Sequence, residues 1–337
     1  MLPTAELRCL WLVVAASVCG DADGAMVWQK AAVIEITPST KSCISNRVFS
    51  IACGGAAKEE CRANASRYAI VIHGWRESCR EKWIEDLQTN LEIYRGGCII
   101  CMDYELAASL PHYLMLTHHV NILAQILKDK LVELELRGYD PSNGYIFGFS
   151  LGARMAIRAG TIYGYQRLGE LDACDMAGPG FDWFDKFDPT VAAKNVQCIH
   201  TSKDKGTLSR NCHQNWNMGV CGMYQYASGI LPGTLSSHGL CTRFYNAAFS
   251  NNFYAEHVPE QCNLVSTVPQ TWPHNYKMGY MERRKSDVRG VLYASTISEY
   301  PYTTNTNQII AYQVPHNVHK RFTMVITDPK HFVLYYR

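Results

Sequence analysis

A serine flanked by glycines is the feature of this sequence that points most directly to chemistry. The pentapeptide GFSLG occupies residues 148–152, after the apolar run Tyr145–Phe147 and before the helical pattern Leu151–Tyr163. A strand, a tight turn and a helix in that order form a nucleophile elbow, which exposes the serine hydroxyl. The N-terminus of the helix then favours negative charge on the attacked carbonyl. We therefore predict that Ser150 is a nucleophile.

A serine hydroxyl needs a base, and the base needs a carboxylate that orients it. In folds built around such an elbow, the chain order is serine, acid, histidine. Two acids, Asp172 and Asp175, follow the serine at a suitable distance. Asp175 lies just before the Ala-Gly-Pro-Gly turn at 177–180, and α/β sheets place functional groups where strands end. This position favours Asp175 over Asp172 as the orienting acid.

The histidine is not decided by spacing alone. His200 ends the strand-like run Val196–His200, whereas His238 lies in a loop of small residues at 236–239. Both positions are compatible with a base that reaches the serine. Three further histidines lie in less distinctive polar stretches: His213, His257 and His274.

The elements that must position these residues alternate along the chain. Short apolar runs predict strands, and apolar residues at helical spacing predict helices. Such alternation predicts a mostly parallel central sheet covered by helices on both faces. The expected strands are Tyr68–Ile72, Cys98–Tyr104, Tyr145–Phe147, a segment around Leu171, and Val196–His200; the expected helices are Glu81–Tyr94, His112–Arg137 and Leu151–Tyr163.

Composition fits one large α/β domain. The chain has 337 residues, of which 47% are hydrophobic and 18% charged, and this allows a sizeable core. The net charge is only +2, with both signs scattered. We therefore expect neither a nucleic-acid partner nor an electrostatic contact with anionic membranes. We also expect no transmembrane segment, because no later run is long and apolar enough.

The first residues have the layout of a secretory signal peptide. Arg8 precedes the apolar run Leu10–Val18, and small residues follow it. This run is too short to span a bilayer. We expect residues 1–20 to be a signal peptide, with cleavage near Gly20 or Ala25, and the protein to be secreted and extracellular. In that compartment Asn64, in Asn-Ala-Ser, becomes a candidate glycosylation site.

Cysteine usage agrees with secretion. Of the 14 cysteines, two lie in the expected signal peptide, and an even set remains, which predicts a disulfide framework. The pairs Cys212–Cys221 and Cys241–Cys262 are expected because each closes a short loop. Cys79 is expected to reach Cys98 or Cys101. Strand alternation would place these last two on opposite faces, which argues against a redox or zinc motif.

Several motifs in a fixed order resemble one known family. From about Tyr68 to about Tyr300 the sequence is similar to the pancreatic-lipase-related superfamily of secreted lipases and phospholipases A1, especially its insect branch of small lipase-like proteins. The motifs that carry the resemblance are VIHGW at 71–75, GFSLGA at 148–153, DMAGP at 175–179, IHT at 199–201, SHGLC at 237–241 and MGY at 278–280.

The resemblance implies an α/β-hydrolase fold and a division of roles. In that family, the residues that match Ser150, Asp175 and His238 form a catalytic triad, and the match to His200 is structural. The residues that match Trp75 and Leu151 supply the N–H groups of the oxyanion hole. The implied activity is hydrolysis of lipid esters through an acyl-enzyme, without a cofactor.

The chain departs from the family pattern at several places. Phe149 replaces the usual histidine beside the nucleophile, and Met176 replaces the usual proline after the acid. The family's calcium-site pattern is only partly recognisable around Asp185 and Asp188, so we expect no metal. The long cysteine-bounded lid is reduced to Ala227–Ser237.

The C-terminal part also departs from the family. Too few residues follow Cys262 for the family's lipid-binding β-sandwich. The expected organisation is a hydrolase domain at 26–303 and a tail of unknown role at 304–337, with strand-like pieces at Phe322–Ile326 and Phe332–Tyr336.

Two classes of function are compatible with these features. One is a secreted carboxylic ester hydrolase, of the lipase or phospholipase A1 type, whose partners are a lipid or ester substrate and, peripherally, lipid surfaces. The other is a non-catalytic secreted lipid-binding or yolk-type protein on the same fold. The intact set of Ser150, Asp175 and His238 favours the enzyme.

Overall fold

The computed structural model describes most of the expected hydrolase domain. The described residues are 67–108, 113–183, 188–229, 235–262 and 271–304, with short strands at 16–18, 27–29, 49–51, 322–328 and 331–336. Of the expected signal peptide, only strand β1 (Ala16–Val18) is described, paired antiparallel with β2 (Val27–Gln29). The candidate glycosylation site at Asn64 lies outside the described residues, so both of these expectations stay predictions.

The centre of the molecule is an eight-stranded sheet with the order β10-β9-β8-β7-β6-β4-β5-β3. Every neighbouring pair from β10 to β5 is parallel, and only the edge strand β3 runs antiparallel to its neighbour. The expected, mostly parallel sheet is therefore confirmed. Its strands are β3 (Phe49–Ile51), β4 (Tyr68–Ile72), β5 (Cys98–Met102), β6 (Gly144–Phe149), β7 (Leu168–Cys174), β8 (Ala193–His200), β9 (Gln214–Met218) and β10 (Gly290–Ala294).

Strand β9 was not expected, because its sequence QNWNM reads as polar. In the structure Gln214, Asn215 and Asn217 are fully buried, and their side-chain N–H groups donate hydrogen bonds, whereas the side-chain oxygen of Gln214 has no partner among the described residues. The Gln214 amide, for example, donates to the backbone oxygens of Lys285 and Val288. Hydrogen bonds to distant segments thus make a polar strand suitable for the core.

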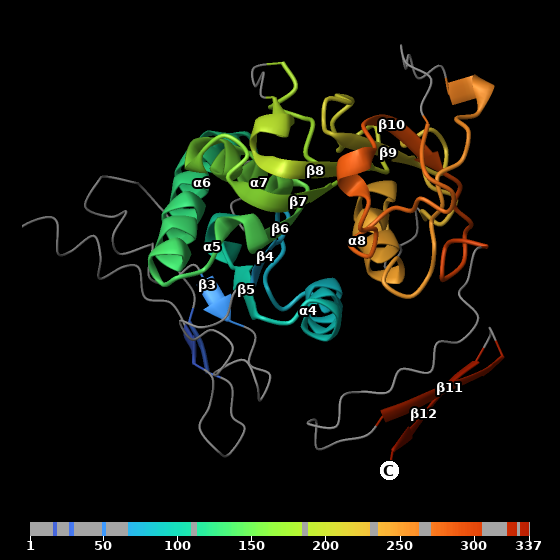
Figure 1. The fold of residues 1–337 in the computed structure, drawn as a ribbon, viewed down its shortest axis with the longest axis horizontal. Coiled ribbons are helices and arrows are strands. Elements are labelled where there is room, and N and C mark those ends of the chain that lie inside the picture. Colours follow the sequence, from blue (N-terminus) through green and yellow to red (C-terminus); the bar gives the residue numbers. More distant parts are fainter. Residues whose placement is uncertain are drawn as a thin grey trace, which may run out of the picture.

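Helices cover both faces of the sheet, as expected (Figure 1). The helices α6 (Tyr113–Leu136) and α7 (Leu151–Tyr163) pack into the core on one face. The helices α4 (Lys82–Tyr94) and α8 (Ser237–Ala247) pack into the core on the other. A short helix, α5 (Glu105–Ala108), follows β5. The sheet with its two helical layers is an α/β-hydrolase fold.

Disulfides join different elements of the fold, and the two expected pairings across short loops are wrong. Cys212 pairs with Cys198 rather than with Cys221, and Cys241 pairs with Cys174 rather than with Cys262. The expectation assumed that close sequence neighbours pair, but the fold brings the end of β7 to the N-terminal half of α8 instead. The bonds that the structure describes are Cys79–Cys101, Cys174–Cys241, Cys198–Cys212 and Cys221–Cys262.

The remaining cysteine expectations hold where they are described. Cys79 reaches Cys101, one of its two expected partners. Cys98 contributes to the core on the α6–α7 side and Cys101 to the core on the α4–α8 side, so the two lie on opposite faces. All nine cysteines of residues 67–304 are disulfide-bonded.

The order of the strands reverses beside β4. The chain passes from β4 to β5 on one side and then returns to β6 on the other side of β4. In parallel α/β sheets, ligands bind outside the carboxyl ends of the strands where the order reverses. The segments that follow β4 and β6 are those that carry Trp75 and Ser150.

The tail contains the two expected strands. β11 (Phe322–Asp328) pairs antiparallel with β12 (His331–Tyr336) as a hairpin. In the part of the chain that the structure describes, no helix has the length and apolarity needed to span a membrane.

Candidate active site

Ser150 occupies the sharp turn between β6 and α7. Its backbone has φ 55° and ψ −115°, a strained conformation for a residue with a side chain. The flanking glycines make the turn possible. A Cβ at Gly148 would lie 2.6 Å from the Gly152 oxygen, and a Cβ at Gly152 would lie 2.5 Å from the His73 oxygen. The strand, turn and helix expected from the sequence are therefore present.

Backbone hydrogen bonds fix the serine turn to the end of β7. The Ser150 N–H donates to the Cys174 oxygen at 2.9 Å, and the Ala177 N–H donates to the Ser150 oxygen at 3.1 Å. These bonds bring the segment after β7, which carries Asp175, beside the segment after β6.

A continuous chain of hydrogen bonds joins the three expected residues. The Ser150 hydroxyl lies 2.8 Å from Nε2 of His238, and Nδ1 of His238 lies 2.6 Å from Oδ2 of Asp175. With Asp175 accepting from Nδ1–H, Nε2 is free to accept the serine proton. Asp175 is fully buried, whereas His238 and Ser150 keep 9% and 7% exposure. The carboxylate is therefore shielded from solvent.

His238 lies in a helix rather than in the expected loop. Ser236 caps α8 by accepting the Gly239 N–H, so His238 belongs to the first turn of that helix. Small residues that resemble a loop are also typical of helix N-termini, where a serine cap is favoured. The ring of Phe149 packs on the His238 ring at 4.8 Å between centroids. Phe149, which stands where the family usually has a histidine, thus supports the His238 ring by packing against it.

The carboxylate of Asp175 is held by donors that sequence reasoning missed. Its Oδ1 accepts the backbone N–H groups of Thr201 at 2.7 Å and Ser202 at 3.1 Å. Its Oδ2 accepts the Ser202 hydroxyl at 2.5 Å, in addition to His238. Thr201 and Ser202 come directly after His200, the last residue of β8. This position after a strand end was the sequence signal that could have identified them as part of the site.

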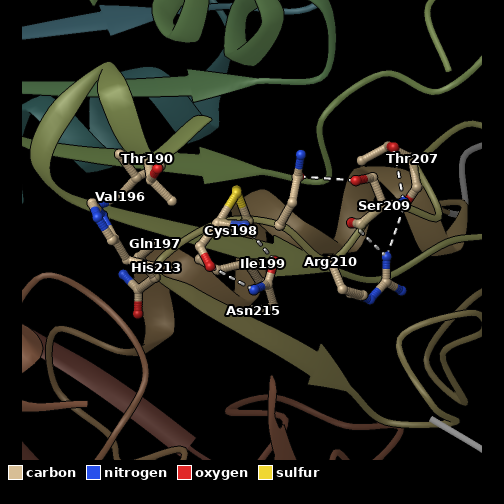
Figure 2. The surroundings of a disulfide bond; sticks show 12 residues. Thr190, Val196, Gln197, Cys198, Ile199, Thr207, Ser209, Arg210, His213 and Asn215 are labelled. Carbon is tan, nitrogen blue, oxygen red and sulfur yellow. Dashed lines mark hydrogen bonds between the residues drawn. A yellow bond between two sulfur atoms is a disulfide. The ribbon is translucent and has the colours of Figure 1, made fainter. Parts of the chain in front are cut away.

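Two disulfides brace this arrangement. Cys174–Cys241 connects the residue before Asp175 to the helical turn that follows His238. Cys198–Cys212 closes a segment that includes Thr201 and Ser202, and Figure 2 shows the surroundings of a disulfide at Cys198. Within that segment Arg210 donates to the backbone oxygens of Thr207 and Ser209. Burial lowers the pKa of Arg210 to about 10, and the nearby acids Asp175 and Asp182 act against that shift.

The competing acid and histidine lie elsewhere. Asp172 is buried in β7 and binds Lys285, with both of its oxygens 3.3 Å from Nζ. His200 is buried with Nε2 3.4 Å from Oδ1 of Asn215. Burial first, and the nearby Arg210 second, hold the pKa of His200 well below its usual value. Asp172 and His200 are thus not part of the hydrogen-bonded chain.

Of the two expected oxyanion-hole residues, Leu151 directly follows the serine. The Leu151 N–H is at the start of α7 and makes no hydrogen bond to any residue described in the structure. Trp75 follows β4, and its ring contacts Tyr113 edge-on at 5.2 Å. The loop that carries Trp75 is braced by Glu77, whose carboxylate accepts the Gly74 N–H at 2.7 Å. The second Glu77 oxygen accepts from the Trp83 indole at 3.3 Å.

Residues 67–304, where described, contain no group of three or more acidic, histidine or cysteine side chains arranged to hold a metal. Asp188 instead caps a short 3-10 helix by accepting the Thr190 N–H at 2.9 Å. Asp185 lies outside the described residues.

Comparisons with known proteins agree with the motifs. Lipase member H of Oryctolagus cuniculus is 30% identical over 139 residues, which is 40% of this chain and 30% of that protein. Pancreatic triacylglycerol lipase of Sus scrofa is 29% identical over 141 residues, 39% of this chain and 30% of that protein. The matched part of the chain thus spans under a third of these relatives.

Among solved structures, a cold-adapted esterase from an Arctic intertidal metagenomic library is similar at 16% identity. The similarity covers 42% of this chain and 64% of that chain, with a TM-score of 0.35. At the level of the family, the sequence matches the model described as Lipase over residues 46–234. This match includes β4 to β9, the serine turn and Asp175, and it covers more than half of the chain. The chain therefore belongs to the lipase family.

Proposed function

We propose that this protein is a secreted serine-type carboxylic ester hydrolase that acts on lipid esters. The observation that carries the proposal is the hydrogen-bonded chain from Ser150 through His238 to Asp175 at a nucleophile elbow. A serine, a base and an orienting acid in this order are what acyl transfer from an ester requires. Membership of the lipase family supports the same reaction class.

In the proposed acylation step, the Ser150 oxygen attacks the ester carbonyl carbon while Nε2 of His238 accepts the hydroxyl proton. The carbonyl electron pair moves onto its oxygen, and the N–H groups of Trp75 and Leu151 stabilise that charge. The intermediate then expels the alcohol, which takes the proton from His238. An acyl-enzyme on Ser150 remains.

Deacylation repeats these steps with water. His238 accepts a proton from the water that attacks the acyl carbonyl, and it returns this proton to the serine oxygen as the carboxylic acid leaves. Asp175 stabilises the imidazolium in both halves, and the two N–H donors from Thr201 and Ser202 keep its carboxylate in place.

A fluorophosphonate probe tests the nucleophile. We expect the probe to label the wild-type protein and not Ser150→Ala, with Ser286→Ala, whose hydroxyl bonds Asp287, as a matched serine variant that is still labelled. Replacing the nucleophile leaves only binding and oxyanion contributions, so ester hydrolysis falls by orders of magnitude. Labelling at another serine, or no labelling of folded wild-type protein, would contradict the proposal and favour a non-catalytic lipid-binding role.

We further propose a phospholipase A1-like or general esterase preference over triacylglycerol hydrolysis. In lidded lipases a mobile segment covers the site until it opens. Here only Ala227–Ser237 connects Tyr226 to His238, and residues 230–234 of it lie outside the described part. Burial stabilises by about 25 cal/mol per Å2 of apolar area, so a short segment of small residues stores little energy for gating.

Exposed apolar side chains near the same edge of the sheet support contact with lipid. Trp183, Leu208 and Leu235 lie on the segments that follow β7, follow β8 and precede α8, and they are 87%, 58% and 36% exposed. These segments leave the sheet at the carboxyl edge, where the serine lies. Peripheral docking of this edge on lipid aggregates is part of the proposal.

Rates on triolein emulsion, phosphatidylcholine vesicles and p-nitrophenyl butyrate test the preference. We expect phospholipid and short-chain ester to be hydrolysed faster than triolein. Against short-chain ester concentration, we expect smooth saturation through the solubility limit. A sharp increase where the emulsion forms would contradict an open site.

Secretion is supported by the disulfides. Disulfides form and persist in oxidising compartments and are rare in the cytosol. N-terminal sequencing of the exported protein tests it, with a start near residue 21 or 26 expected.

A further inference from the structure

Three arginines surround a cavity at the edge of the sheet opposite the serine. The cavity has a volume of about 230 Å3, and its lining includes Arg67, Arg95 and Arg283. Arg67 precedes β4, Arg95 caps the C-terminus of α4, and Gly144, which also lines the cavity, begins β6. Six residues of β6 separate Gly144 from Ser150, which corresponds to about 20 Å. The cavity is therefore separate from the candidate active site.

The charges of these arginines are not compensated within the described structure. Arg95 donates to the backbone oxygens of Tyr68 and Asn143 and to the Tyr280 hydroxyl, all of them neutral acceptors. Arg283 stacks its guanidinium over the Tyr280 ring at 5.1 Å. Among the described residues, no carboxylate lies within ion-pair distance of any of the three guanidinium groups.

One carboxylate, Glu170, lines the cavity, but it is bound to another cation. Its oxygen lies 3.1 Å from Nζ of the buried Lys285. Burial acts to raise the pKa of Glu170, but Lys285 and the nearby arginines outweigh it and lower the pKa overall. The carboxylate thus stays ionised in its bond to Lys285, and an excess of positive charge remains in the cavity.

We propose that this cavity binds a phosphate or sulfate group. Guanidinium groups hold such anions through paired N–H donors in a fixed geometry. Cations that converge from three separate segments match a tetrahedral anion, because it offers an oxygen to each of them, whereas a carboxylate has only two oxygens. Arg95 is already fixed by its neutral acceptors, so one wall of the site is preorganised. The volume corresponds to roughly eight waters, enough for a phosphate or sulfate group with part of a small molecule attached.

Thermal unfolding of the full-length protein with added anions tests the proposal. Inorganic phosphate, inorganic sulfate, glucose 6-phosphate and acetate are titrated at constant ionic strength set with sodium chloride. A ligand that binds only the folded protein raises the melting temperature in a saturable way. We expect this for phosphate and sulfate and not for acetate. Tighter binding of glucose 6-phosphate than of phosphate would identify a phosphorylated solute as the source, and equal binding would identify the free ion.

Charge-matched variants make the test specific to the cavity. Each charge-assisted hydrogen bond contributes enough that Arg283→Gln should weaken the apparent Kd about tenfold or more. The double variant with Arg67→Gln should not respond. Arg137→Gln removes the same charge from an exposed site after α6 and should behave as wild type. An equal response in Arg137→Gln and Arg283→Gln, a response to acetate as large as to phosphate, or no response of wild type would overturn the proposal.

Discussion

Asp172 lies in β7, and Asp175 directly follows that strand. Substitution by asparagine should affect stability at the first position and activity at the second. Asp175 contacts His238, whereas Asp172, three residues earlier, contacts buried Lys285. We predict that Asp175→Asn removes activity and leaves the fold intact. We predict that Asp172→Asn lowers stability and leaves the turnover of the folded protein nearly unchanged.

The magnitudes follow from these contacts. Loss of the orienting carboxylate of a serine triad costs on the order of 10⁴ in kcat. Loss of one partner of a buried ion pair costs about 3–5 kcal/mol of unfolding free energy. Lys285 keeps Glu170 at 3.1 Å, so we expect the lower value, about 3 kcal/mol. For a domain of this size that corresponds to a decrease of about 6–12 °C in Tm. Burial acts to lower the pKa of Lys285, but Asp172 and Glu170 raise it overall, so its charge persists.

The assay combines circular dichroism melting with kcat on p-nitrophenyl butyrate, measured well below both melting temperatures. A double variant, Asp172→Asn with Lys285→Met, is the control, because removing both charges should recover part of the stability lost by removing one. The reasoning is refuted if Asp172→Asn melts as wild type, or if its kcat falls as far as that of Asp175→Asn.

Three further predictions concern a disulfide, a loop carboxylate and a buried histidine. Removing the Cys174–Cys241 bridge with two alanines should lower kcat more than removing Cys221–Cys262, because only the first connects the acid to the histidine helix; equal losses in a kinetic comparison would contradict this. Glu77→Gln should lower kcat with KM unchanged, because one of the two N–H donors to Glu77 loses its acceptor; an effect on KM alone would argue against a role in holding the Gly74 loop. Burial lowers the pKa of His213 from 6.5 to about 4. Between these two pH values the histidine is protonated in the unfolded chain and neutral in the folded chain, so the free energy of unfolding should decrease as the pH falls from 6.5 to about 4. Urea melts from pH 7 to 4.5 should show a smaller decrease for His213→Asn, and equal slopes would refute the assignment.

Much of the fold is predictable from local sequence. The strand β4 and the helix α7 begin and end at the expected residues, because a strand buried on both faces must be continuously apolar and a helix covering a sheet must repeat at helical spacing. The turn at Ser150 is local in part, since a Cβ at Gly148 would meet Gly152 within the turn itself, whereas Gly152 is required by the approach of the His73 oxygen from the end of β4.

What depended on the tertiary structure involves residues far apart in the chain. The disulfide partners of Cys174 and Cys212 could not be obtained from loop length, because the fold and not the sequence distance sets which sulfurs meet. β9 has polar side chains that become acceptable in the core only through partners supplied by other segments. The chemistry was therefore indicated by the sequence of one turn. The geometry that joins Ser150 to His238 was decided by the packing of β6, β7 and α8, because hydrogen-bond distances between separate elements are fixed only when those elements pack together.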